Sequence, residues 1–235
     1  MTAGEIVKQL ETLGQASYRR VLVAHGAAEP VFGVKIEELK KIQKQVKTDY
    51  QLALDLYDTG IYDAMYLAGL IADDDRMTKR DLQRWARGAT SAGISEYTVA
   101  WVAADGPLGR ALALEWIESK QERIAATGWA TLSGLVSVTD DASLNLAELT
   151  QLLQRVQETI HQQPNRVRAT MNGFVIAVGA YVAPLVAQAL ATGKAMGAVT
   201  VDVGGTACKV PFAPESIAKV RARGSIGKKR TSTKC

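Results

Sequence analysis

Residues 165–184, NRVRATMNGFVIAVGAYVAP, decide the fold predicted for this chain of 235 residues. The segment begins with Arg166 and Arg168 and continues as an almost uncharged run of small and apolar residues. A helix that is apolar on all sides is buried on all sides, and about 15 residues are too few to span a bilayer. We therefore predict a central helix whose body lies in the core and whose basic first turn lies at a surface.

The composition is that of a folded globular protein of one or two domains. Hydrophobic residues make up 47% of the chain and charged residues 22%, which excludes a disordered chain. The N-terminus lacks a signal-peptide pattern, and no apolar run reaches about 20 residues. The two cysteines, Cys208 and Cys235, fit a reducing compartment. These features predict a cytoplasmic protein with no membrane partner.

The formal net charge of +4 is unevenly distributed. Residues 209–235 hold eight basic residues and one acidic residue, so they carry +7 and residues 1–208 carry −3. Any nucleic-acid interaction must therefore use local basic patches on a mildly acidic body.

Helical periodicity runs through most of the chain, and one stretch repeats. LALDLYDT at 52–59 matches LALEWIES at 112–119, an offset of 60 residues, and a helical stretch rich in small residues follows each copy. Thr78 and Asp81 form a capping-box pattern that predicts a helix start. Paired helices that repeat predict an all-α solenoid of stacked antiparallel helix pairs, although chance similarity between two Leu/Ala-rich helices is a rival explanation.

The pattern changes near residue 196. Val199, Val201 and Val203 alternate with polar residues before Gly204 and Gly205, which predicts a short β-hairpin. A short helix follows, and residues 225–235 are expected to form a mobile basic tail. We accordingly divide the chain into a helical solenoid, 1–195, and a C-terminal extension, 196–235.

The residues offer little conventional catalytic chemistry. The only histidines, His25 and His161, lie far apart without neighbouring cysteines, so neither a metal site nor any cofactor is expected. The acidic runs 73–75 and 140–141 are interpreted as solvated loops that cap the next helix rather than as metal ligands. Trp101 either packs in the core or presents its ring to a base or a sugar, and the core is favoured.

Basic residues at helix starts are the more informative group. In a solenoid, equivalent helix ends line one surface, so these residues could form a stripe that follows a phosphate backbone. An ordinary solvated face explains the same pattern equally well. The residues expected to contact DNA are Lys35, Lys120, Arg123, Arg166 and Arg168, with Lys228, Lys229 and Arg230 adding non-specific attraction.

Three stretches resemble the DNA alkylation repair family of HEAT-like glycosylases. They are FGVKIEELKKI at 32–42, LALDLYDTGIYDAMYLAGLIAD at 52–73 and the segment NRVRATMNGFVIAVGAYV that begins at residue 165. The C-terminal motif VDVGGTACKVP at 201–211 and the later ARGSIGKKR resemble a bacterial subgroup of that family. The resemblance implies a HEAT-like solenoid that binds duplex DNA, alkylated or otherwise damaged, and hydrolyses the N-glycosidic bond of alkylated purines. It also implies a catalytic carboxylate and two tryptophans that stabilise the developing sugar cation.

The alignment departs from the family pattern at that catalytic set. The carboxylate falls on Ala100, and the second tryptophan falls on Gly173 or Phe174. We therefore expect a DNA-binding protein and leave its enzymatic activity open. One alternative is an active glycosylase that uses Glu96 or Asp105 with Trp101, and another is a HEAT-like scaffold whose basic tail binds an acidic protein partner.

Overall fold

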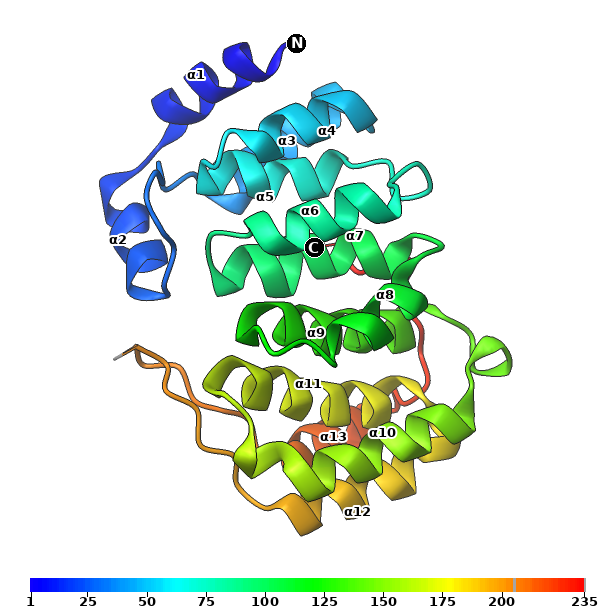
Figure 1. The fold of residues 1–235 in the computed structure, drawn as a ribbon. Helices are drawn as coiled ribbons and strands as arrows, with labels where there is room; N and C mark the ends of the chain where they lie inside the picture. Colours follow the sequence, from blue (N-terminus) through cyan, green and yellow to red (C-terminus); the bar gives the residue numbers. More distant parts are fainter. Residues whose placement is uncertain (205, 235) are drawn as a thin grey trace. The chain divides into compact units, whose positions relative to one another are not determined.

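The computed structural model describes residues 1–204 and 206–234, and all regular elements within these residues are helices (Figure 1). Contacts between Cα atoms divide the chain into two compact units. Unit 1 contains residues 1–108 together with Val203, Gly204, Thr206 and Lys234, and unit 2 contains residues 109–202 and 207–233. The boundary predicted between residues 195 and 196 stays a prediction, but the helix near the C-terminus packs within unit 2.

Unit 1 is built around one buried helix. All residues of this helix from Asp63 to Ile71 are buried, and it packs against the helices before and after it in the chain. The Asp63 carboxylate, 1% exposed, accepts hydrogen bonds from the backbone N–H groups of residues 32–34. The helices of unit 1 are α1 (Ala3–Leu13), α2 (Ala16–Ala24), α3 (Ile36–Val46), α4 (Tyr50–Asp58), α5 (Tyr62–Ile71), α6 (Lys79–Gly88), the π-helix η1 (Ile94–Val99) and α7 (Ala100–Asp105).

Unit 2 begins with a helix pair that corresponds to α4 and α5 in the 60-residue repeat. The helices of unit 2 are α8 (Gly109–Trp116), α9 (Glu122–Val138), η2 (Asp141–Ser143), α10 (Leu146–Thr159), η3 (Ile160–Gln162), α11 (Asn165–Tyr181), η4 (Ala183–Leu185), α12 (Val186–Met196) and α13 (Ala213–Ala222). Both copies of the repeated motif lie at the start of a helix pair, α4–α5 and α8–α9, and the two helices of each pair pack together. The backbone N–H of Asp49, before α4, donates to the carbonyl of Ile71 at the end of α5, so that pair is antiparallel.

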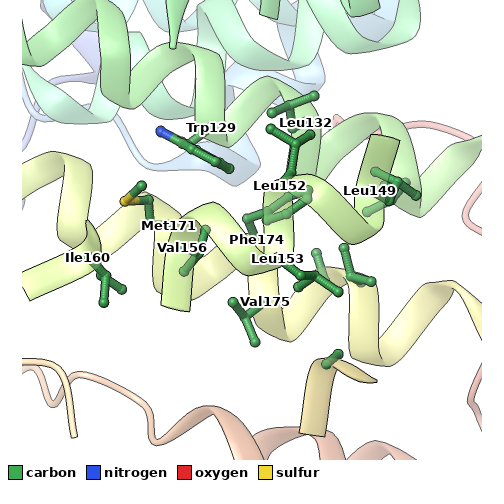
Figure 2. Packing of buried hydrophobic residues seen from close by; sticks show 14 of the residues in the cluster. Trp129, Leu132, Leu149, Leu152, Leu153, Val156, Ile160, Met171, Phe174 and Val175 are labelled. Atoms are coloured by element: carbon green, nitrogen blue, oxygen red, sulfur yellow. The ribbon is translucent and has the colours of Figure 1, made fainter. Parts of the chain in front are cut away.

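The prediction of a central buried helix is confirmed by α11. Its side chains Val167, Met171 and Phe174 are 2% exposed or less, and it packs against α9, α12 and α13. The rings of Phe174 and of Trp129 on α9 are in contact, with centroids 5.3 Å apart. Figure 2 shows Phe174 below Trp129. The close approach of α13 requires a glycine, because a Cβ at Gly179 would lie 2.4 Å from Cδ1 of Ile217.

The predicted β-hairpin is wrong. No strand is present among the described residues, and its second turn residue, Gly205, lies outside them. An isolated two-stranded hairpin is marginally stable, and this segment instead uses its backbone groups on α11. Asn165 Nδ2 donates to the carbonyl of Asp202, whose N–H donates back to Asn165 Oδ1, and Asn172 Nδ2 donates to the carbonyl of Pro211.

The expectation of a mobile basic tail is also wrong for two of its lysines. Within unit 2, Lys229 Nζ lies 2.8 Å from Asp141 Oδ1 and donates to the carbonyl of Val136 in the last turn of α9. Within unit 1, Lys234 Nζ lies 2.8 Å from Asp74 Oδ2 and donates to the carbonyl of Ala72, just after α5. Both side chains are only 13% exposed. A cation is favoured at a helix C-terminus, so each lysine stabilises the end of one helix.

The same contacts correct the interpretation of the two acidic runs. Asp74 and Asp141 are not solvated caps, because each receives a lysine from the C-terminal segment. The cap of α6 is instead Thr78, whose side chain accepts from Asp81 N in the predicted capping box.

None of the helices in residues 1–204 and 206–234 is by itself long and apolar enough to cross a membrane. Residues Asn165–Tyr181 and Ala183–Met196 satisfy the length and composition criteria only as a pair, which is bent by 113°.

Candidate nucleic-acid interface

The first turns of α9 and α11 lie side by side in unit 2. The backbone N–H of Arg166 donates to Glu122 Oε1 over 2.6 Å, which joins the start of one helix to the start of the other. Further along the two helices, Trp129 and Phe174 are in contact. The helices are therefore parallel, and their N-terminal ends open on one surface.

Four of the basic residues predicted to bind DNA meet at this surface. Lys120 and Arg123 are exposed at the start of α9, and Arg166 and Arg168 are partly exposed in the first turn of α11. We call Lys120, Arg123, Arg166 and Arg168 the basic cluster. Each helix N-terminus adds about half a positive charge, so two helix ends and four cations attract anions here, while the carboxylate of Glu122 opposes them.

The segment after α12 contacts the first turn of α11. The paired hydrogen bonds between Asn165 and Asp202 hold the chain beside the first turn of α11. Farther along this segment, Cys208 and Lys209 are exposed. Asp202, at the start of the predicted hairpin, is thus held next to the basic cluster.

The remaining predicted DNA contacts lie elsewhere. Lys35 precedes α3 in unit 1, with its Nζ 3.8 Å from Glu37 Oε1. In unit 2 the N–H of Arg230 donates to the carbonyl of Ser137, so the tail lies at the opposite end of α9 from the basic cluster. A helix of this length, 17 residues, is about 25 Å long. Lys228 and Arg230 are exposed, whereas the charge of Lys229 is paired with Asp141.

The candidate catalytic residues lie in unit 1, on η1 and α7. Glu96 is partly exposed on the π-helix, and Trp101 is partly exposed on α7. Asp105 ends α7 and lies near enough to Asp74 to raise the pKa of that carboxyl. Burial is the main cause of that rise, which brings the pKa of Asp74 to about 6 even though Lys234 opposes it.

The positions aligned with the family's catalytic carboxylate and second tryptophan carry no equivalent side chain. Ala100 is 2% exposed and Phe174 is fully buried. A Cβ added at Gly173 would meet nothing within 4 Å, so the helix surface there is open. No group of three or more metal-ligating side chains occurs in the part of the chain that the structure describes.

Sequence patterns did not indicate two features of these sites. Glu122 binds the first turn of α11, and its only sequence signal is an acid in a helix start, which many helices share. The π-helix η1, with Tyr97 exposed on it, is the second feature. Isolated π-turns are rare and have no marked sequence signature, although they occur often at functional sites.

Comparison with known proteins agrees with this architecture. A model of the family described as DNA alkylation repair enzyme matches residues 6–204. The chain belongs to this family. It is 31% identical to uncharacterised proteins of Listeria innocua and Listeria monocytogenes over 95% of its own length and 99% of theirs.

One solved structure covers the chain in full. It is 34% identical with a TM-score of 0.93, and it covers 100% of both chains. It is described as a new family of proteins related to the HEAT-like repeat DNA glycosylases with affinity for branched DNA structures. The all-helical fold of this chain thus matches that of a HEAT-like repeat protein.

Proposed function

We propose that this chain is a DNA-binding protein that recognises branched DNA, with the basic cluster of unit 2 as its main phosphate contact. The observation that carries the proposal is the meeting of Lys120, Arg123, Arg166 and Arg168 at two adjacent helix N-termini. Arginine and lysine at a helix start are suited to hold phosphate oxygens, through charge and through backbone N–H groups together. The affinity of the structural relative for branched DNA supports the choice of ligand.

The basic cluster also has a shape suited to a DNA backbone. Partly exposed positions that follow the first turns of the two helices include Ala169 and Gly173 of α11 and Ala130 of α9. Small side chains at these positions project little from the helices, so a phosphodiester backbone could lie close to them. The cations lie at one end of these helices, where they would fix the position of the backbone.

The test measures binding to a four-way junction and to a duplex of equal length by fluorescence anisotropy. Contacts to about four phosphates predict a loss of about 100-fold in affinity between 50 and 200 mM salt. The charge-reversal variant Arg166→Glu/Arg168→Glu should abolish binding. The matched control is Lys8→Glu/Lys44→Glu, which makes the same charge change on exposed positions of α1 and α3.

The control variant should bind within about twofold of the unmodified protein at 150 mM salt, because its changes leave the basic cluster intact and salt screens their effect. Equal losses in both variants would mean that net charge, rather than the basic cluster, governs binding. Binding that does not respond to salt, or no binding at all, would refute the proposal.

Glycosylase activity is a separate question. The buried Ala100 and the side-chain-free Gly173 support a DNA binder that does not cleave the glycosidic bond. The alternative enzyme would use Glu96 or Asp105 with Trp101. Incubation of methylated duplex DNA with the protein, followed by measurement of released 7-methylguanine, decides between them. We expect no release above the protein-free rate, and release that Glu96→Gln or Asp105→Asn abolishes would establish the enzyme.

A further inference from the structure

Aromatic rings gather around the π-helix of unit 1. Trp101 packs edge-on against Tyr66 of α5, with centroids 5.5 Å apart and planes at 87°. Tyr97 of η1 also packs against Trp101, with centroids 5.6 Å apart and planes at 56°. Trp101 thus joins a buried ring, Tyr66, 7% exposed, to an exposed ring, Tyr97, 54% exposed, and we call these three rings the row.

Two glycines allow this row to be held rigidly. A Cβ at Gly69 of α5 would lie 2.6 Å from Cγ2 of Thr98, so the π-helix packs directly on the α5 backbone. A Cβ at Gly93 would lie 2.7 Å from the Tyr62 hydroxyl, so that ring reaches the start of η1. The exposed ring of Tyr97 therefore belongs to a turn that is fixed from both sides, which limits the entropy that a ligand would have to remove.

Further phenols lie near the row, together with the buried carboxylate of Asp63 and the partly exposed carboxylate of Glu96. Tyr18 and Tyr97 both contribute to the raised pKa of Tyr62, so each of these phenols lies near the Tyr62 ring. Burial is the first cause that raises the pKa of Tyr62 to about 12, so its hydroxyl stays protonated at neutral pH. Glu96, the neighbour of Tyr97 in the chain, is partly exposed. This carboxylate disfavours a phosphate at the same place but does not repel a neutral base.

We propose that Tyr97 and Trp101 form a stacking platform for unpaired bases at the branch point of a DNA ligand. In a duplex the bases are already stacked on one another, whereas a branch point offers exposed base faces to an aromatic ring. The basic cluster of unit 2 would bind backbone in any DNA, and the platform would supply the preference for branched DNA. This inference rests on the proposed function, because it assigns a second contact to the same ligand.

The experiment uses the full-length protein and a three-way junction with two unpaired bases at the branch, one of them 2-aminopurine. Stacking on an aromatic ring should quench 2-aminopurine fluorescence. All four tryptophans lie in the described part of the chain, and Trp85, Trp116 and Trp129 are 4% exposed or less. A change in tryptophan emission on binding that the Trp101→Phe variant no longer shows therefore reports on Trp101.

Two substitutions of Tyr97 distinguish the effect of its aromatic face from the effect of its apolar volume. Tyr97→Phe keeps the ring and should retain junction affinity and quenching. Tyr97→Leu keeps an apolar side chain without a π-face and should lose about tenfold in junction affinity, because stacking on a protein ring contributes roughly that factor per base. The duplex affinity of both variants should equal that of the unmodified protein, and far-UV circular dichroism confirms that each variant is folded.

The outcomes distinguish the two proposals. If the unmodified protein binds junctions and Tyr97→Leu binds them equally well, with the same quenching, the platform is refuted while the DNA-binding function stands. An equal loss on junction and duplex also refutes it, because the ring would then be a general contact. If the unmodified protein binds no DNA at low salt, both the proposed function and the stacking platform are refuted.

Discussion

The backbone N–H of Arg166 and the carboxylate of Glu122 are joined by a hydrogen bond of 2.6 Å, which sets the first turn of α11 beside the first turn of α9. The carboxylate thus satisfies a helix N-terminus, and at the same time it places a negative charge among four cations. The Glu122 carboxylate therefore stabilises the start of α11 but lowers the affinity of the basic cluster for an anion.

Glu122→Gln should raise DNA affinity by about threefold at 50 mM salt and by less at 200 mM, because it removes a repulsive charge from the basic cluster and salt screens the effect. The amide oxygen can still accept from Arg166, so the melting temperature should change little. Anisotropy titrations at both salt concentrations check this. Glu11→Gln, an equal charge change at an exposed position of α1, is the control and should leave affinity unchanged.

Lys234→Met should destabilise the protein, and the loss should depend on pH. The raised pKa of Asp74, about 6, lies above its unfolded value, so the folded state binds more protons between about pH 4 and 6. The free energy of unfolding therefore falls as pH rises through this window. Removing Lys234 takes away the cation that stabilises the ionised carboxylate, which enlarges the penalty above pH 6.

The expected cost of Lys234→Met is about 1–2 kcal/mol at pH 8 and less at pH 4.5, where Asp74 is protonated. Urea unfolding at both pH values measures it. The double variant Asp74→Asn/Lys234→Met should recover most of the stability at pH 8. A cost that does not change with pH would contradict the pairing of Lys234 with Asp74.

Lys229→Met should cost about 2 kcal/mol, because it leaves Asp141 and the last turn of α9 without their cation. Lys228→Met, at the exposed neighbouring position, should change stability by about 0.5 kcal/mol or less. Thermal unfolding of the two variants compares them directly. Similar melting temperatures would show that Lys229 is not a structural cation.

Gly173→Ala and Gly179→Ala, on the same helix, should have opposite effects. A Cβ at Gly173 meets open space, so alanine should stabilise α11 by about 0.5–1 kcal/mol through its higher helix propensity. A Cβ at Gly179 meets Ile217 at 2.4 Å, so alanine there should force α13 to shift and cost about 1–3 kcal/mol. Chemical denaturation decides the signs, and a stabilising Gly179→Ala would disprove the close contact with α13.

Much of the secondary structure could be predicted from the sequence, because it depends on patterns that lie within single helices. The apolar run after Arg168 predicts the buried α11, and Thr78 with Asp81 predicts the start of α6. The 60-residue repeat predicts two equivalent helix pairs, which are α4–α5 and α8–α9. The hairpin prediction failed because alternation in a few residues does not show whether a chain segment pairs with itself or with a helix.

The sequence by itself thus determined most of the helices, which helix is buried and which side chains are cationic. Only the tertiary structure decided which cations act together. Arg123 and Arg166 lie on one surface because α9 and α11 pack in parallel. Lys229 does not belong to the basic cluster, because it binds the Asp141 carboxylate and the Val136 carbonyl at the other end of α9. Tyr97 and Trp101 join Tyr66 because a π-turn packs against α5. Such contacts join residues that are far apart in the chain, and burial and packing geometry set them rather than any local pattern.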